Sequence, residues 1–100
     1  MKVVFHPEAY DEMLESARFF NDKNPGLGAD LINAVQDATR RLANFPKYGP
    51  VEHASIRKCL VRGFPFAILY EVLNDRIFIA AVMHQHRRPY YWRHRIRQNL

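Results

Sequence analysis

The feature that most constrains this chain is a run of apolar residues with helical spacing that stops at a proline. The apolar positions recur at steps of three and four residues over about five turns, which is the pattern of an amphipathic helix. They are Leu27, Leu31, Ala34, Val35, Ala38, Leu42 and Phe45. Pro46 follows them, and proline cannot continue a helix. We therefore expect a helix from Leu27 to Phe45 whose apolar stripe is buried against another part of the fold.

A second amphipathic helix is predicted just before this one. Pro7 suits the first turn of a helix, where its missing N–H costs nothing, and the acidic residues after it favour the positive end of the helix dipole. Apolar residues then recur at helical steps at Tyr10, Met13, Leu14, Ala17 and Phe19 or Phe20. Asn24 precedes Pro25, so the helix should end within 21–24. The short Asn-Pro-Gly break between the two helices predicts an antiparallel helical hairpin.

The other segments are predicted to be strands and loops. Strands are expected at 2–5, 56–61, 66–73 and 76–83, a loop at 47–55, and a last helix from Tyr90 to Gln98. The segment 66–73 is almost entirely apolar and rich in β-formers, which is typical of a central strand. Alternation along the strand at 76–83 should place Ile77, Ile79 and Ala81 on one face.

These elements predict an α+β fold in one domain spanning residues 1–100. In this fold, an N-terminal strand joins the edge of an antiparallel β-sheet, the antiparallel helical hairpin packs on one face of the sheet, and a short basic C-terminal helix follows. A chain of 100 residues can bury one modest hydrophobic core. If the hairpin covers one face, the other face is bare, and we expect the basic residues of the C-terminal half on it or beside it.

The charges are divided unevenly along the chain. Residues 1–55 carry six Lys and Arg against eight Asp and Glu, whereas residues 56–100 carry nine Lys and Arg against two acids. A positive field of this kind favours an anionic partner, either a nucleic acid or an acidic protein. The alternative is a basic surface that only keeps the protein in solution.

Other classes of protein are disfavoured by what the sequence contains. It has no apolar run long enough to span a bilayer and no N-terminal segment typical of a secretion signal, so we expect a cytoplasmic protein without a membrane partner. The single cysteine, Cys59, cannot form an internal disulfide and is expected to be a buried, inert thiol. His84 and His86 could point the same way from a strand, but no third ligand is near in sequence. We therefore predict no metal site and no cofactor.

Three segments in this order resemble the RelE/ParE superfamily of toxins. They are Arg57-Lys58-Cys59-Leu60-Val61, the aromatic-rich strand Phe64-Pro65-Phe66-Ala67-Ile68-Leu69-Tyr70-Glu71-Val72, and Ile79-Ala80-Ala81-Val82-Met83-His84-Gln85-His86-Arg87-Arg88-Pro89-Tyr90-Tyr91-Trp92. The resemblance covers nearly the whole chain. It implies the toxin of a type II toxin–antitoxin system, a growth inhibitor of the kind associated with plasmid stabilization. It also implies neutralisation by a cognate acidic antitoxin, with a possible hetero-oligomer between the two.

The resemblance leaves two activities open. RelE-like members cut messenger RNA on the ribosome, whereas ParE-like members poison DNA gyrase. Metal-independent RNA cleavage needs a base, an acid and cations around one phosphate. By the resemblance, Ala67 stands where RelE-like enzymes have a strand arginine, and Trp92 stands near the position of their C-terminal tyrosine. These departures favour the ParE-like branch, in which no catalytic residue is expected.

Two alternatives remain beside the gyrase poison. The first is a ribosome-dependent mRNA endoribonuclease, which would have to use Arg57, Arg62, His86, Arg87 and Tyr91. In this set the imidazole of His86 would be the base, because histidine is the side chain that most often acts as a general base. The second is a non-toxic module that only binds an antitoxin.

The residues expected to bind the target or the antitoxin are basic and aromatic. They are Arg57, Lys58, Arg62, His86, Arg87, Arg88, Tyr91, Trp92, Arg93 and Arg95. The arginine fork suits bidentate contacts with phosphates and carboxylates, and Trp, Tyr and Arg dominate interface hot spots. The structural interpretation of the same residues is a C-terminal helix docked by Trp92 and Ile96 with a solvated arginine face.

Overall fold

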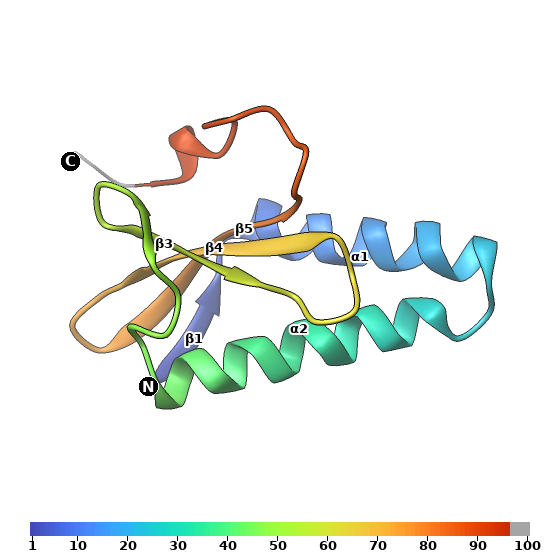
Figure 1. The fold of residues 1–100 in the computed structure, drawn as a ribbon, viewed down its shortest axis with the longest axis horizontal. Coiled ribbons are helices and arrows are strands. Elements are labelled where there is room, and N and C mark those ends of the chain that lie inside the picture. The colour runs from blue at the N-terminus through green and yellow to red at the C-terminus, as the bar shows by residue number, and fades with distance from the viewer. Residues whose placement is uncertain (97–100) are drawn as a thin grey trace.

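The computed structural model describes residues 1–96, and its elements follow the predicted order (Figure 1). They are β1 (Lys2–Phe5), α1 (Pro7–Lys23), α2 (Leu27–Asn44), β2 (Val51–His53), β3 (Ile56–Leu60), β4 (Phe66–Val72), β5 (Arg76–His84) and a 3-10 turn at Arg93–Arg95. The α+β class is confirmed. None of the described helices is long and apolar enough to cross a membrane.

The helical hairpin is confirmed, with α2 ending one residue before the predicted end. At the start of α1, the His6 imidazole accepts a hydrogen bond from the backbone N–H of Glu8 at 3.0 Å. Before α2, Gly26 adopts a φ of 95°, a left-handed conformation that glycine takes at low cost. Gly28 lets α2 approach α1 closely, because a Cβ at this position would collide with the carbonyl oxygen of Ala17.

The sheet has the strand order β1-β5-β4-β3-β2, with β1 at an edge as predicted, and it is a mixed sheet. β1 pairs with β5 in parallel, and the other neighbours are antiparallel. The long connection between β1 and β5 allows parallel pairing, which a tight turn cannot provide. The predicted loop at 47–55 contains the short edge strand β2, whose pairing with β3 is irregular between Val51 and His53.

A β-bulge in β5 changes the predicted faces of this strand. Ile79 lies opposite Tyr70 and Ala81 lies opposite Leu69, so Ala80 is the extra residue. The extra residue reverses the alternation of side chains beyond it. Ile77 and Ile79 therefore join the helix-side core, whereas Ala81 faces the other side, contrary to the prediction.

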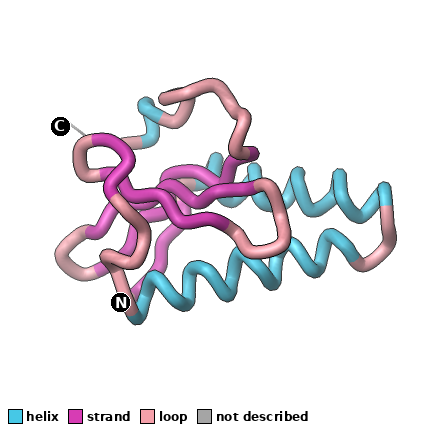
Figure 2. The backbone as a smooth tube through the Cα atoms, viewed as in Figure 1, coloured by secondary structure: helices cyan, strands magenta, loops and turns pink. Residues whose placement is uncertain are grey.

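The main core lies between the hairpin and the sheet, which form two layers in Figure 2. The hairpin contributes mainly aliphatic side chains, and the sheet adds the fully buried Ile68 and Tyr70 of β4. Its helical members are Ala9, Met13, Ala17, Leu31, Val35, Ala38 and Leu42. This layer is the predicted packing of the hairpin on one face of the sheet.

The opposite face of the sheet is not bare, which corrects the prediction. The chain after β5 folds back over it (Figure 1), and Trp92 is buried with Ile56, Leu69 and Ala81 in a second hydrophobic cluster. The predicted helix at 90–98 is absent from its described part, where only the 3-10 turn Arg93–Arg95 forms. Arg97 and Gln98 lie outside the described residues. The basic residues of this half are thus not gathered on an open sheet face.

Candidate functional site

The carboxylate of Glu12 is the centre of the polar network that holds the C-terminal segment. It accepts two hydrogen bonds from the Arg95 guanidinium, one to each oxygen, at 2.9 and 3.0 Å. It also accepts one from the Tyr91 hydroxyl at 2.6 Å and one from the backbone N–H of Val82 at 3.0 Å. Bidentate arginine–carboxylate pairs are the strongest of such contacts. Glu12 therefore joins α1, β5 and residues 91–95.

The position of this network follows from the length of β1. β1 pairs with β5 only as far as Ile79, so within residues 1–96 no further strand lies beside this edge of β5 beyond that residue. There the N–H of Val82 donates to Glu12, and the carbonyl oxygen of Ala80 accepts from Arg95 at 3.0 Å. Buried backbone groups need partners. The Glu12–Arg95 pair supplies these partners where β1 ends.

A second carboxylate one helical turn earlier extends the network. Glu8 lies 3.4 Å from the Arg95 guanidinium and 3.1 Å from the His94 imidazole. The hydrogen bond with His94 is the main cause that lowers the pKa of Glu8. Burial lowers the pKa of Arg95, but the hydrogen bonds that Arg95 donates to Glu12 and the negative charge of Glu12 outweigh burial and leave this pKa raised. Both α1 carboxylates thus stabilise the charged guanidinium of Arg95.

Tyr91 and Arg87 complete the group around Glu12. The Arg87 guanidinium lies 3.8 Å from the Tyr91 ring centre, in cation–π geometry, and 3.8 Å from a Glu12 oxygen. Burial, together with donation to Glu12, raises the pKa of Tyr91 strongly. The hydroxyl therefore keeps its proton and acts as a donor in this network.

We predict that the contribution of Tyr91 to stability is lost in alkali. Because the pKa of Tyr91 is higher in the folded state, the contribution is complete below the unfolded value of 10.0 and falls as the pH rises above it. Tyr91→Phe should lower the free energy of unfolding by about 1.5–3 kcal/mol near neutral pH, since it removes a bond to a charged group. Urea denaturation at a series of pH values should show this deficit shrinking above pH 10. A constant deficit would contradict the prediction.

The structure places the aromatic and basic residues of the C-terminal segment in two groups. Trp92 and Arg95, which were expected on an exposed binding surface, are 5% and 6% exposed, and Tyr91 is half-buried. Trp92 packs in the second hydrophobic cluster, and Tyr91 and Arg95 donate hydrogen bonds to Glu12. His86, Arg87, Arg88 and Arg93 remain exposed.

Arg57 also has a different place from the one expected. Its Cα partner is Tyr70, whose side chain belongs to the helix-side core, and its guanidinium donates to the carbonyl oxygen of Gly49 at 2.7 Å. The Tyr70 hydroxyl donates to Pro46 O at 2.8 Å and accepts from Gly49 N at 2.9 Å. Arg57 and Tyr70 together fix the loop that joins α2 to β2.

Lys58 and Arg62 line a groove of about 660 Å³ beside the edge of β3. Arg41, from the last turn of α2, lies in the same groove. Its guanidinium is 5.3 Å from the ring centre of Tyr48. Cys59 is buried at this groove, and burial raises the pKa of its thiol. The thiol is therefore neutral. Lys58 lies opposite Leu69 of the second cluster, so the strand register directs its side chain toward the other face of the sheet, whereas Arg41, Arg62 and Glu52 are the other charged residues at this groove.

The five residues of the ribonuclease alternative are only partly brought together. Arg87 contacts Tyr91, and His86 lies next to Arg87 in the chain. Arg57 faces the hairpin side of the sheet, whereas Tyr91 packs with the cluster on the opposite side. The Tyr91 hydroxyl already donates to Glu12.

The paired histidines occupy the end of β5. The rings of His84 and His86 are 5.3 Å apart, and His84 accepts a hydrogen bond from the backbone N–H of His86. His84 also contacts the Phe66 ring, so it lies beside α1 and β4 and not beneath the C-terminal segment. Within residues 1–96, no three His, Cys, Asp or Glu side chains lie close enough to hold a metal ion.

Sequence reasoning missed Glu12, Arg41 and Tyr48. Glu12 is one of the acidic residues that follow Pro7, and its partner Arg95 is 83 residues away, so no local pattern connects them. Arg41 lies outside the basic half of the chain, and Tyr48 lies in a predicted loop. The sequence does carry one signal for the groove, which is the aromatic residue Tyr48 two positions after the helix-ending Pro46.

Comparison with known proteins supports the toxin-like interpretation of the fold. Residues 3–89 match the family described as "ParE toxin of type II toxin-antitoxin system, parDE". A solved structure described as "Chromosomal ParDE TA system from P. aeruginosa" superposes with a TM-score of 0.72 at 16% sequence identity. The match covers 84% of this chain and 95% of that one. No curated protein sequence matches significantly.

Proposed function

Because this chain belongs to the ParE toxin family of type II toxin–antitoxin systems, we propose that it stops growth by binding and poisoning DNA gyrase. The observation that carries the proposal is the match to the ParE family over residues 3–89. A cognate acidic antitoxin neutralises the toxin in this proposal, and the two form a hetero-oligomer. The target and the antitoxin are then met in the cytoplasm.

The surroundings of two side chains favour a binding mode of action over RNA cleavage. A general acid or base must be within reach of the substrate proton that it transfers. The Tyr91 hydroxyl is engaged with Glu12, and the Arg57 guanidinium is engaged with the carbonyl oxygen of Gly49. Both groups already hold contacts within the fold, which disfavours a role for them at a phosphate. The exposed residues His86, Arg87, Arg88 and Arg93 are those that we propose for target contacts.

The proposal is tested by inducing the protein in growing cells and by adding the purified protein to gyrase. We expect viable counts to fall after induction, and we expect the purified protein to inhibit DNA supercoiling. The charge reversal Arg88→Glu/Arg93→Glu, at two exposed arginines outside the Glu12 network, should weaken this inhibition by about tenfold or more, because it reverses two of the proposed interface charges.

The same experiment separates the alternatives. Absence of supercoiling inhibition at large excess of toxin would contradict the gyrase proposal. Messenger RNA cleaved within codons after induction, detected by primer extension, would support the endoribonuclease instead. Unchanged growth would support the non-toxic module that only binds an antitoxin.

A further inference from the structure

Within residues 1–96, two residues other than glycine have a left-handed backbone. They are Ala54, with a φ of 52°, and Tyr90, with a φ of 61°. In this region the Cβ of an L-residue crowds the backbone, so the conformation is strained for a side chain as bulky as tyrosine. Tyr90 also follows Pro89 in a turn, where a left-handed residue is usually glycine or asparagine. The chain thus keeps a tyrosine at a position that glycine would occupy without strain.

The Tyr90 side chain contributes little to the hydrophobic core. Tyr90 is 45% exposed, and it is not a member of either hydrophobic cluster. By comparison, the nearby Trp92 is 5% exposed and belongs to the second cluster. Burial of apolar surface therefore does not explain why a tyrosine occupies this strained position.

The Tyr90 ring instead joins the turn after β5 to the turn between β2 and β3. Its centre lies 5.0 Å from that of the His53 ring, at the end of β2, in an edge-to-face arrangement. His53 directly precedes Ala54, so the two left-handed positions come together at this ring contact. Strained residues persist where the surrounding structure fixes them, and they cluster at functional sites.

The Tyr90 ring also carries an exposed arginine. The Arg93 guanidinium lies 5.5 Å from the centre of this ring, within cation–π distance. The backbone N–H of Arg93 donates to the carbonyl oxygen of Tyr90 at 3.1 Å, so the turn fixes the two residues relative to each other. An arginine that is already held over a ring loses less side-chain entropy when an anionic group binds to it.

We propose that Tyr90 and Arg93 form the central contact of this protein with its target, and that the left-handed backbone of Tyr90 presents this pair to solvent. Tyr90 contacts the target with its exposed ring and positions Arg93, which binds a carboxylate of the target protein. Tyrosine and arginine are the residue types that dominate interface hot spots. The inference rests on the proposed function, because it names a residue, Tyr90, that determines affinity within the proposed target surface.

The pair fits a protein carboxylate better than a nucleic acid. The planar fork of arginine matches a carboxylate with two hydrogen bonds, and one carboxylate can approach Arg93 alone. The residue after Arg93, His94, holds the half-exposed carboxylate of Glu8 at 3.1 Å. A negative charge at this place would repel a continuous phosphate backbone.

Three substitutions at position 90 separate the ring from the backbone. Tyr90→Phe keeps the ring, Tyr90→Ala removes the ring but keeps a Cβ at positive φ, and Tyr90→Gly removes both. Tyr90→Gly should unfold at a higher urea concentration than Tyr90→Ala, because glycine adopts positive φ without strain. The measurement is urea denaturation followed by circular dichroism.

Binding of the labelled full chain to purified gyrase, without DNA, tests the role of the ring. Tyr90→Ala and Tyr90→Gly should each raise the dissociation constant by about tenfold or more, whereas Tyr90→Phe should raise it by less than about threefold. A purely structural tyrosine gives another order, in which affinity follows stability and Tyr90→Gly binds more tightly than Tyr90→Ala. That order would overturn the inference.

A double-mutant cycle tests whether Tyr90 positions Arg93. Arg93→Ala should raise the dissociation constant by about tenfold in the wild type but by about twofold or less in Tyr90→Gly, because the arginine has lost its ring there. Equal effects in the two backgrounds would show that the residues act independently, and the positioning role would fail.

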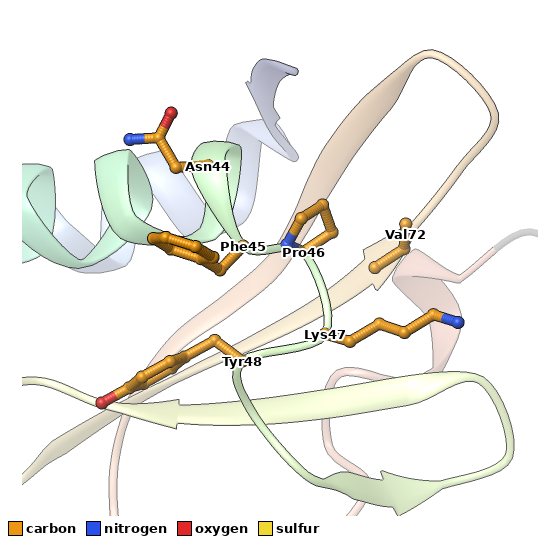
Figure 3. Close-up of a pocket in the computed structure, with 6 residues that line it drawn as sticks. All are labelled: Asn44, Phe45, Pro46, Lys47, Tyr48 and Val72. Carbon is orange, nitrogen blue, oxygen red and sulfur yellow. The ribbon is translucent and has the colours of Figure 1, made fainter.

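The control removes an exposed ring from another loop. Phe45 is 64% exposed and lines a hollow of about 660 Å³ beside Pro46 and Tyr48 (Figure 3). Its φ is −135°, so its backbone is not left-handed. Phe45→Ala should leave the dissociation constant within about twofold. Equal losses in Phe45→Ala and Tyr90→Ala would overturn the assignment to Tyr90.

The outcomes separate the inference from the function on which it rests. If the wild type binds gyrase and Tyr90→Gly binds it as tightly, the proposed function stands and the inference fails. If the wild type stops growth without binding gyrase, the gyrase proposal fails, and viable counts at matched expression decide the inference. Weaker toxicity of Tyr90→Gly than of Tyr90→Phe would then support it, and equal toxicity would overturn it. A wild type that neither binds gyrase nor stops growth overturns both, and tighter binding to a DNA duplex alone would overturn the assignment to a carboxylate.

Discussion

Replacing Glu12 by alanine lowers the free energy of unfolding by about 3–5 kcal/mol, because it removes the bidentate partner of a buried arginine and leaves only the half-exposed Glu8 carboxylate beside it. The Arg95 side chain is 5% exposed, and Glu12 accepts both of its terminal nitrogens. The variant also removes the acceptor of the Tyr91 hydroxyl and of the Val82 N–H. Urea denaturation followed by circular dichroism measures the change.

A matched control and a double variant test the cause. Glu15→Ala removes an exposed carboxylate from the same helix and should change the free energy of unfolding by less than about 0.5 kcal/mol. Glu12→Leu/Arg95→Met should be more stable than Glu12→Ala, since it removes the unpaired charge together with its partner. Equal stability of Glu12→Ala and Glu15→Ala would show that the network contributes nothing.

Trp92 gives this experiment a local readout, because it is the only tryptophan of the chain. Its indole is buried against β3, β4 and β5. In Glu12→Ala we expect the fluorescence change at lower urea than the change in circular dichroism, since the C-terminal segment detaches before the hairpin and sheet unfold. Coincident transitions would indicate that the segment and the sheet unfold together.

The parts of the fold that depend on local chemistry could be predicted from the sequence. Pro7 and Pro46 mark helix boundaries through the missing N–H of proline, and the apolar periodicity between them identifies the buried faces of α1 and α2. The central position of β4 follows from its nearly continuous apolar sequence. In these cases the residues that form the sequence pattern are the same residues that determine the local structure.

The parts that depend on distant contacts could not be predicted. The bulge at Ala80 reverses the faces of β5, and nothing in the local sequence marks the extra residue. β1 is short, and this creates the free edge of β5 that Glu12 and Arg95 occupy. Arg95 is therefore buried in the Glu12 network, whereas Arg87, Arg88 and Arg93 are exposed. A count of charges along the chain cannot separate the buried arginine from the exposed ones.

The groove at the edge of β3 illustrates the same limit. The positive charge of the second half of the chain drew attention to Lys58 and Arg62, and both line the groove at the edge of β3. Arg41 joins them only because α2 ends beside β3, and Tyr48 borders them because Tyr70 fixes its loop. Chain packing decides which of the many cations share one groove.

Replacing Trp92 by alanine should lower the free energy of unfolding by about 3–5 kcal/mol, the usual cost of truncating a buried tryptophan. Its indole fills the second cluster with Ile56, Leu69 and Ala81, and this cluster covers the sheet face that the hairpin leaves free. Trp92→Phe should retain much of this stability, because an aromatic ring still fills most of the site. The measurement is urea denaturation followed by circular dichroism.

The control for Trp92→Ala is Tyr90→Ala, which removes a 45% exposed ring from the same segment and should cost much less. If both variants lose less than about 1 kcal/mol, the segment does not cover the sheet in solution. The face predicted from the sequence would then be bare after all, with its arginines free to meet a partner. A large loss confined to Trp92→Ala means that apolar packing and the Glu12 network both hold residues 91–95 down. Target contacts would then fall to His86, Arg87, Arg88 and Arg93, whose side chains this packing leaves exposed.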